Sequence, residues 1–254
     1  MILDQFSLDG KTALVTGASG GLGAAIAVSL AEAGAAVACH GSRAGNADGT
    51  VARIGSFGGR AFAVTGELSD KSVPKRLIEE VAGNFGRLDI LVNNAGTIRR
   101  SPAADYSDQD WDDVIEINLS SVFRLCREVG KVMLNHGGGK IINIASLLSF
   151  QGGITVPAYT ASKSAVAGLT KALANEWARS NINVNAIAPG YMITNNTAAL
   201  RADENRNRQI LERIPAGRWG SPEDIAGAAV FLSSAASDYL HGHVMAVDGG
   251  WLGR

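Results

Sequence analysis

The chain has 254 residues, of which 46% are hydrophobic, 31 are glycine and 6 are proline, a composition that predicts a globular chain with tightly turned connections. Its formal charge of -1 argues against nucleic acid or an anionic membrane surface as a partner. No apolar run approaches the roughly 18 residues of a membrane span, and MILDQFSLDGK lacks the features of a secretory signal. A cytoplasmic protein is therefore expected.

Apolar segments alternate with segments of helical spacing along the whole chain. The expected strands span residues 12–16, 35–40, 60–68, 88–94, 140–146, 182–189 and 243–249. Several of them are apolar without strict alternation, as in strands that helices cover on both faces. This rhythm predicts one doubly wound α/β domain over residues 1–254, with a seven-stranded parallel sheet.

The first expected strand runs directly into TGASGGLG, residues 16–23. Gly17, Gly21 and Gly23 are spaced so that the chain turns tightly and brings backbone amides close to phosphates, at the positive end of the following helix. Any tight strand-to-helix turn needs glycine, but the position after the first strand favours a dinucleotide site.

The second expected strand ends in CHGSR, residues 39–43, without the acid that usually binds an adenosine ribose at this place. Gly41 occupies the usual acidic position. Ser42 and Arg43 offer a hydroxyl and a guanidinium suited to a phosphate. Because an acid would repel a 2′-phosphate, its absence favours NADP(H), with NAD(H) possible.

Tyr159 and Lys163 stand four residues apart in a segment of helical spacing, so they share one helix face. An unperturbed phenol has a pKa of about 10, and a nearby ammonium stabilises the phenolate. The pair therefore predicts a lowered pKa for Tyr159 and proton exchange with a substrate hydroxyl or carbonyl.

The segment 191–219 interrupts the alternation just after a strand's carboxyl end, where open α/β sheets bind ligands. It is either a lid that closes over a substrate or a surface excursion that only packs, and the sequence supports both equally. His241 and His243 share a strand face but have no third ligand, so no metal site is expected.

Five motifs appear in order: TGxxxGxG, Asn93-Asn94-Ala95-Gly96, a serine at the end of the fifth strand, YxxxK, and Pro189-Gly190. Together they resemble the short-chain dehydrogenase/reductase family over essentially the whole chain. The resemblance implies a Rossmann-type fold, a nicotinamide cofactor and carbonyl–alcohol interconversion by hydride transfer. It also implies a homotetramer, with helices around 103–135 and 158–180 and the terminal segment at its interfaces.

The resemblance assigns a role to each catalytic position. Tyr159 is implied as the general acid/base, and Lys163 as the residue that lowers its pKa and holds the nicotinamide ribose. Ser146, thirteen residues before the tyrosine, is implied to bond the reacting oxygen. Asn118 is implied to keep a water in a proton relay. Strand-end or helix capping is the alternative for Ser146 and Asn118.

The implied cofactor positions run along the whole chain. Glu67 stands where an aspartate frequently accepts from the adenine amine, so its contact is a departure from the family pattern. The positions are Gly17, Ser19, Gly21, Leu22, Gly23, Ser42, Arg43, Glu67, Leu68, Asn93, Asn94, Ala95, Gly96, Tyr159, Lys163, Pro189, Gly190, Met192 and Thr194.

Several stretches, among them GTIRR (96–100) and RIPAGRWG (213–220), resemble the branch of the family that acts on sugar acids such as 2-dehydro-3-deoxy-D-gluconate, 2-deoxy-D-gluconate and gluconate. Such a substrate needs a cation for its carboxylate and hydrogen-bonding groups for its hydroxyls. Arg99 and Arg100 are candidates for the cation, and Gln151 and Asn195 for the hydroxyls. For at least one arginine, a solvated loop or subunit contact is the competing interpretation.

Three other functions are weighed against this one. Sugar-nucleotide epimerases with YxxxK have a large carboxyl-terminal substrate domain. Only about sixty residues follow Pro189 here, which is too few for such a domain. A 3-oxoacyl reductase for carrier-linked chains shares the opening of NLSSVFRLCREV, but no basic docking patch for a carrier protein is evident. A non-catalytic cofactor-sensing protein on the same fold would not need Tyr159, Lys163 and Ser146, and all three are present.

Overall fold

A sheet of seven parallel strands forms the centre of the molecule, in the order β3-β2-β1-β4-β5-β6-β7. The computed structural model describes residues 1–254. The predicted Rossmann-type α/β fold is confirmed. The strands are β1 Thr12–Val15, β2 Ala36–Gly41, β3 Ala61–Thr65, β4 Ile90–Asn93, β5 Gly139–Ile144, β6 Ile182–Pro189 and β7 Val244–Val247.

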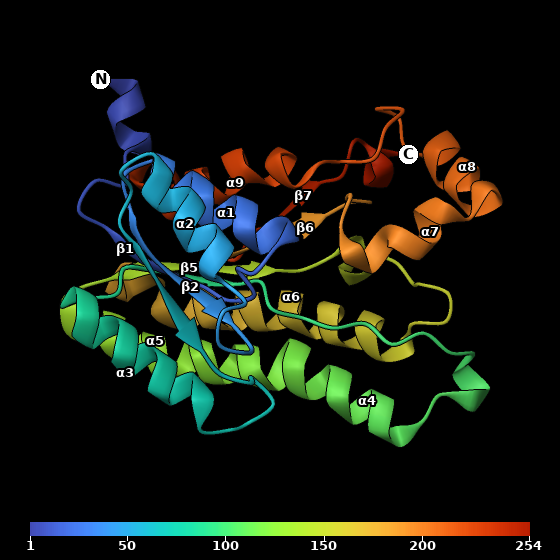
Figure 1. Cartoon of the computed structure of the whole chain (residues 1–254), viewed down its shortest axis with the longest axis horizontal. Helices are drawn as coiled ribbons and strands as arrows, with labels where there is room; N and C mark the ends of the chain where they lie inside the picture. The colour runs from blue at the N-terminus through green and yellow to red at the C-terminus, as the bar shows by residue number, and fades with distance from the viewer.

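Helices cover both faces of this sheet (Figure 1). On one face lie α1 (Gly21–Glu32), α2 (Asp48–Ser56) and α9 (Ala226–Ser233). On the other lie α3 (Val73–Phe85), α4 (Asp108–Ile115), α5 (Ser121–His136) and α6 (Pro157–Trp177). None of the helices combines the length and the apolarity that a membrane span requires.

Successive residues of the strands supply two separate hydrophobic cores. Ala13 and Val15 of β1 pack in the core beneath α1, whereas Leu14 between them belongs to the core shared with α3 and α5. Neighbouring side chains on a strand point to opposite faces, and here both faces are covered by helices. This arrangement explains why the strands are apolar without a polar alternation.

Five of the seven strands are shorter than the sequence predicts, and β3 and β7 show the physical reason. The segment expected over 60–68 leaves the sheet at Thr65, because the Gly66 carbonyl contacts the ring of His40 rather than a ladder partner. The strand expected over 243–249 ends at Val247, and Gly249 follows with a φ of +65° that does not continue a strand.

The segment 191–219 lies beyond the carboxyl ends of the strands, where α7 (Ala198–Ala202) and α8 (Glu204–Arg213) are drawn in orange (Figure 1). A parallel bridge between Met192 and Gly220 closes its base. The segment has a small apolar core of its own, which includes Trp219, the carboxyl-terminal Trp251 and Leu147 beside the fifth strand. The segment therefore packs against the carboxyl-terminal residues of the chain.

Candidate active site

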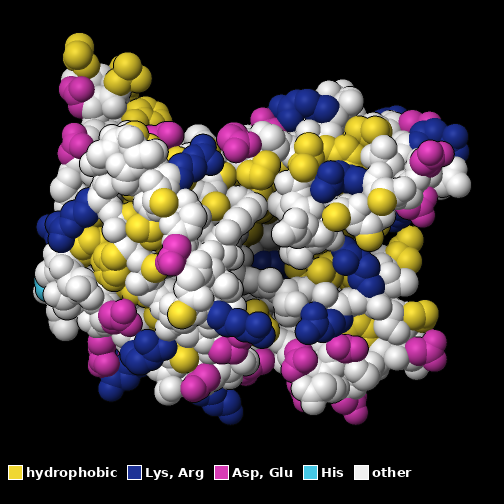
Figure 2. Space-filling view, viewed as in Figure 1, with side chains coloured by type: hydrophobic (Ala, Val, Ile, Leu, Met, Phe, Trp, Pro, Cys, Tyr) yellow, Lys and Arg dark blue, Asp and Glu magenta, His cyan; other side chains and the backbone are white.

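A cleft of about 520 Å³ runs over the carboxyl ends of the strands, which is where open α/β sheets bind ligands. Figure 2 shows a hollow near the middle of one face, with Lys and Arg side chains around it. A basic surround favours anionic ligands such as phosphates and carboxylates. No group of three or more His, Cys, Asp or Glu residues that could hold a metal ion is found in the chain.

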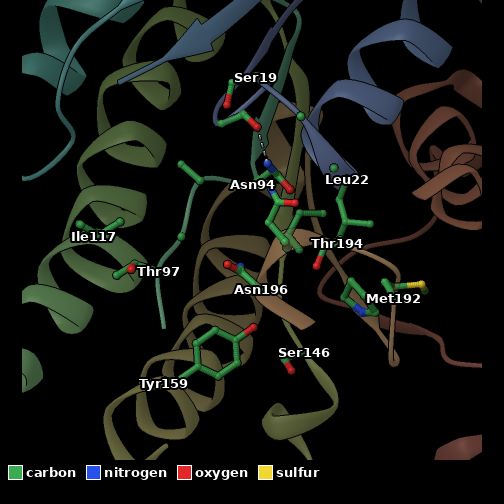
Figure 3. Close-up of a pocket in the computed structure, with 18 of the residues that line it drawn as sticks. Ser19, Leu22, Asn94, Thr97, Ile117, Ser146, Tyr159, Met192, Thr194 and Asn196 are labelled. Atoms are coloured by element: carbon green, nitrogen blue, oxygen red, sulfur yellow. Dashed lines mark hydrogen bonds between the residues drawn. The ribbon is translucent and has the colours of Figure 1, made fainter. Parts of the chain in front are cut away.

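Most of the predicted site residues line this single cleft. These residues are Gly17, Ser19, Gly21, Leu22, Ser42, Glu67, Leu68, Asn94, Ala95, Gly96, Ser146, Tyr159, Lys163, Pro189, Gly190, Met192, Thr194 and Asn195. Figure 3 shows Ser19 toward one end of the pocket, with Tyr159 and Ser146 together toward the other. The predicted residues outside the lining are Gly23, Arg43, Asn93, Arg99, Arg100, Asn118 and Gln151.

The glycine loop between β1 and α1 is held by Asn94, whose amide nitrogen donates to the carbonyls of Thr16 at 2.9 Å and Gly17 at 3.1 Å. Gly17 has a φ of +64°, which favours glycine. A Cβ at Gly23 would lie 2.1 Å from the Gly17 carbonyl oxygen, so only glycine allows α1 to begin this close to the loop. Gly23 thus supports the site from outside the cleft.

The amino terminus of α1 opens onto the same cleft. Gly20 is its N-cap and makes no side-chain cap bond, and a Cβ at Gly20 would meet nothing within 4 Å. The first amides of a helix have no partner within the helix and carry partial positive charge. The loop and helix end therefore fit the pyrophosphate of a dinucleotide.

The end of β2 presents Ser42 to the cleft and leaves Arg43 on the exposed surface beside it. A Cβ at Gly41 would lie 2.9 Å from the Cβ of Asn46, so the usual acidic position is too crowded for a larger residue without a shift. The absence of an acid here therefore follows from the packing of the loop as well as from the sequence.

Tyr159 and Lys163 come from adjacent turns of α6 and line the cleft together. The Lys163 ammonium lies 5.6 Å from the centroid of the Tyr159 ring and donates to the Ile144 carbonyl at the end of β5, at 2.6 Å. Lys163 is only 5% exposed, and its burial lowers its pKa to about 8. The predicted helix face is thus confirmed in geometry.

The predicted lowering of the Tyr159 pKa by Lys163 is wrong for this structure. Burial raises the pKa of Tyr159 above its ordinary value, and this effect outweighs those of the Ser146 hydroxyl and the Arg100 charge, which lower it. Periodicity placed the two side chains on one face but gave no information about their desolvation.

Ser146 follows β5 and is oriented by the short helical turn that it caps. Its hydroxyl oxygen accepts from the Leu148 backbone N–H at 3.2 Å. An accepting hydroxyl keeps its own proton for donation. Figure 3 shows Ser146 at the same end of the pocket as Tyr159, and the Ser146 hydroxyl lowers the pKa of this phenol.

Asn118 lies beneath the cleft in a π-helical turn, Glu116–Ser120, between α4 and α5. Its fully buried amide accepts from the Thr97 N–H at 2.8 Å and donates to the Thr97 carbonyl at 2.9 Å. It also donates to the Ser162 hydroxyl at 3.2 Å. π-turns of this kind occur frequently at functional sites, and here the turn supports the cleft wall at Thr97.

Asn93 is buried under the cleft rather than in its lining. Its side-chain nitrogen donates to the Asn143 oxygen at 2.9 Å, so it joins β4 to β5. Of the four residues of this motif predicted to contact a cofactor, Asn94, Ala95 and Gly96 line the cleft. A single-residue step along a strand reverses the face of the side chain, which explains why the first residue of the motif points away.

Of the arginine pair, Arg100 is the one whose charge acts on Tyr159. Its guanidinium donates to the Asn196 carbonyl at 3.0 Å, and its charge acts on the pKa of Tyr159. The Arg99 side chain forms an ion pair with Asp110, with 3.3 Å between Nε and Oδ1, and bonds the Thr97 hydroxyl.

The two amides proposed for substrate hydroxyls differ in position. Asn195 lines the cleft. Gln151 lies outside the lining, where its side-chain oxygen accepts from the Trp251 indole N–H at 3.2 Å and from the Arg213 guanidinium at 3.4 Å. Gln151 therefore joins the loop after β5 to the segment 191–219 and the carboxyl terminus.

The lining also contains residues that no motif predicted: Gly20, His40, Thr97, Ile117, Ile144, Ala145, Asn196 and Thr197. Most of them are sequence neighbours of predicted residues, so widening each motif by one or two positions would have included them. His40 is different because it is a buried polar residue at the end of an apolar strand. A buried polar side chain requires hydrogen-bond partners, and a histidine in an apolar strand was the signal that could have indicated His40.

Comparisons with known proteins agree over the whole chain. The model of the family described as short chain dehydrogenase matches residues 11–205. A 2-dehydro-3-deoxy-D-gluconate 5-dehydrogenase of Dickeya dadantii is 56% identical over 255 residues, which cover 100% of both chains.

Two solved structures share the fold and carry NADP. One, from Agrobacterium tumefaciens and provisionally named a 2-deoxy-D-gluconate 3-dehydrogenase, is 58% identical with a TM-score of 0.94, covering 99% of this chain and 100% of its own. The other, from Beutenbergia cavernae and provisionally named an NAD(P)-dependent gluconate 5-dehydrogenase, holds NADP at low occupancy. It is 52% identical with a TM-score of 0.95, covering 98% of this chain and 100% of its own.

Proposed function

The chain belongs to the short-chain dehydrogenase family, and we propose that it interconverts a secondary alcohol and a ketone on a sugar acid of the 2-dehydro-3-deoxy-D-gluconate or 2-deoxy-D-gluconate type. One observation supports this most: Ser146, Tyr159 and Lys163 line one end of a cleft whose other end is a glycine loop. The full-length identity of 56% to a sugar-acid dehydrogenase supports the choice of substrate.

The chemistry of the site follows from its side chains. A nicotinamide dinucleotide, when bound, supplies or accepts the hydride. Tyr159 then takes the hydroxyl proton during oxidation and returns it to the carbonyl oxygen during reduction. Ser146 donates a hydrogen bond to the same oxygen and orients it. Lys163, held by Ile144, would hold the nicotinamide ribose with its remaining N–H groups.

The carboxylate of the sugar acid is proposed to bind Arg100. This guanidinium is positioned by Asn196 and acts electrostatically on Tyr159. Arg99 is the weaker candidate, since Asp110 already neutralises much of its charge. Asn195 in the cleft lining is the candidate for a substrate hydroxyl, whereas Gln151 is used to hold the neighbouring segment.

NADP(H) is the proposed preferred cofactor. Ser42 lines the cleft at the end of β2, Arg43 follows it, and no acid stands at either position. A hydroxyl and a guanidinium suit a 2′-phosphate better than free ribose hydroxyls. The two NADP-bound structures support the same preference.

The segment 191–219 is proposed to act as the lid of a single domain. It adjoins the cleft at Asn195 and Asn196, and its apolar core includes Leu147, the residue after Ser146. A segment anchored at both places can change its contact with substrate without disturbing the sheet.

A homotetramer is proposed from the family resemblance. Trp111 of α4 and Phe123 of α5 are large apolar side chains that remain 41% and 43% exposed in the single chain. Exposed aromatic residues of this kind are enriched at subunit interfaces. Their helices lie in the region 103–135 that the resemblance places there.

The competing functions have less support. A cofactor-sensing protein has no use for a hydroxyl, a phenol and a buried ammonium at one end of the cleft. A 3-oxoacyl reductase would use the same catalytic residues, but it has no need of the Arg100 cation beside Tyr159. The substrate therefore decides between the two enzyme classes.

The test is a substrate panel measured by absorbance at about 340 nm, where the reduced nicotinamide absorbs. Sugar acids, their keto forms and 3-oxoacyl thioesters are each offered with NADP(H) and with NAD(H). We expect turnover of the sugar acids, abolished in Tyr159→Phe. Turnover of the acyl thioesters alone would overturn the sugar-acid assignment.

A further inference from the structure

His40 at the end of β2 contacts both loops that border the dinucleotide end of the cleft. We infer that His40 is a positioning residue which, as a neutral imidazole with its proton on Nε2, joins the glycine loop to the loop after β3 and so maintains the affinity for the cofactor. The inference rests on the proposed dinucleotide function.

On one side, His40 holds two successive amides of the glycine loop. The Gly17 N–H donates to the ring Nδ1 at 3.2 Å, and the Ala18 N–H donates to the His40 backbone carbonyl at 2.8 Å. Since Gly17 lines the cleft, the ring helps to fix the loop in the conformation that faces a pyrophosphate.

On the other side, the ring Nε2 lies 2.8 Å from the Gly66 carbonyl oxygen. Glu67 and Leu68, the next two residues, line the cleft. The hydrogen bond therefore determines where the chain leaves β3 and how these two side chains are presented. One ring thus controls the spacing between the two loops.

The two partners determine the tautomer. Nδ1 accepts from an N–H and so carries no proton, whereas Nε2 faces a carbonyl and must donate. A second proton would add to Nδ1 and set two donors against each other at Gly17. Only the neutral ring makes both contacts.

Burial supports the neutral state. His40 is 2% exposed, and burial lowers its pKa below the ordinary value. The Gly66 bond and Glu67 act in the raising direction, and Arg76 of α3 adds to the lowering. β1 and the glycine loop contribute backbone contacts without charge. Because the pKa of His40 lies below the roughly 6.5 of a free imidazole, the ring stays neutral to more acid pH, and the bond to Gly17 should be lost as pH falls through the lowered pKa.

Three variants of the full chain separate the contacts. His40→Asn keeps an acceptor for Gly17, His40→Gln keeps a donor for Gly66, and His40→Phe keeps a ring but removes both. The dissociation constant of NADPH is measured by fluorescence titration, and kcat at saturating cofactor and substrate is measured alongside. We expect His40→Phe to weaken NADPH binding more than tenfold and the two amide variants to lie between it and the wild type, with kcat changed less than about twofold.

The pH dependence provides a measurement that a merely structural role would not affect. The ratio of the wild-type dissociation constant to that of His40→Asn is followed from neutral to acid pH, so that titration of the 2′-phosphate, with a pKa of about 6, cancels. We expect this ratio to stay level at about pH 6.5 and to rise at more acid pH, as His40 gains its proton at its lowered pKa. Asn cannot titrate, so only the wild-type contact is lost.

A flat ratio across this range, or wild-type NADPH affinity in His40→Phe, would overturn the inference alone. Loss of kcat without loss of affinity would also overturn it, because it would place His40 in the chemical step. If the wild type bound neither NADPH nor NADH, the proposed function would fail and the inference with it. If His40→Phe does not fold, His40→Asn and its pH ratio still decide.

Discussion

Tyr159 is influenced by neighbours that shift its proton affinity in opposite directions. Burial raises its pKa, while Ser146 and Arg100 lower it. Oxidation of an alcohol needs the phenol in a state that accepts a proton, and the fraction in that state rises with pH. Any change that raises the Tyr159 pKa therefore moves the activity profile for oxidation to higher pH.

Arg100→Gln should raise the Tyr159 pKa, because it removes a charge that lowers it, and should therefore move the activity profile for oxidation to higher pH. It should also raise KM for the sugar acid by about tenfold, the loss expected for one charge-assisted contact. The measurement is kcat/KM for oxidation as a function of pH. Arg100→Lys retains the charge and should shift the profile less. Arg99→Gln is the matched control, because Arg99 is already paired with Asp110. Equal shifts in Arg99→Gln and Arg100→Gln would contradict the assignment.

The proposed preference for NADP depends on Arg43, which lies outside the cleft lining. Arg43→Ala should reduce kcat/KM with NADP by about tenfold and leave that with NAD nearly unchanged, because only NADP offers the phosphate charge. Arg53→Ala, an exposed arginine in the last turn of α2, is the control. If NADP and NAD lose equally, Arg43 is a surface residue without a role in selection.

The sequence predicted the site residues that belong to local motifs, and it missed those whose role depends on contacts with distant parts of the chain. Ser146, Tyr159 and Lys163 have fixed spacings on one chain segment, and all three line the cleft. The partners of His40 come from β1 and from the loop after β3, so no local pattern indicates them. The raised pKa of Tyr159 was missed for a similar reason, since burial depends on the whole fold.

Among the elements, the start of α1 is the most sterically constrained. A Cβ at Gly23 would lie 2.1 Å from the Gly17 carbonyl oxygen and 2.4 Å from the Asn94 amide nitrogen. Neither atom can move without displacing the glycine loop. The sequence predicted glycine here for a tight turn near phosphates, and the structure identifies the loop carbonyl and Asn94 as the atoms that exclude a side chain.

Gly23→Ala should therefore destabilise the fold by about 2 kcal/mol, within the usual range for overpacking, and weaken cofactor binding as well. Gly49→Ala is the matched control, because Gly49 lies in α2 with nothing within 4 Å of a new Cβ. It should stabilise by about 0.5–1 kcal/mol through helix propensity. Urea denaturation measures both. A neutral Gly23→Ala would show that the loop adapts.

The strands and helices were predictable because their pattern is local. Every expected strand is present, and β6 matches its predicted bounds of 182–189. The ends that differ depend on tertiary contacts, such as the bond from His40 to Gly66 after β3. The π-turn at Glu116–Ser120 was not predictable from a local pattern, because its Asn118 accepts a hydrogen bond from the backbone N–H of Thr97, a residue distant in sequence.

For the molecule as a whole, the seven-stranded parallel sheet followed from the alternation of strands and helices, whereas the order of its strands was not predicted. The contact of the segment 191–219 with the carboxyl terminus was not predicted either. Tyr191 packs against Trp251 with ring centroids 4.7 Å apart, and Arg213 lies 4.0 Å above the Trp251 ring. Residues this distant in sequence meet only because the sheet brings β6 and β7 side by side.

We propose that the chain transfers a hydride between a nicotinamide and a carbon of a sugar acid. Deuterium transfer tests this proposal most directly. The purified protein is incubated with a keto sugar acid and with reduced cofactor that carries deuterium at the transferring position of the nicotinamide. The mass of the product is then measured by mass spectrometry. We predict a sugar-acid alcohol heavier by about one mass unit, and none with Tyr159→Phe. A sugar acid that gains no deuterium, beside an acyl ketone that does, would contradict the account.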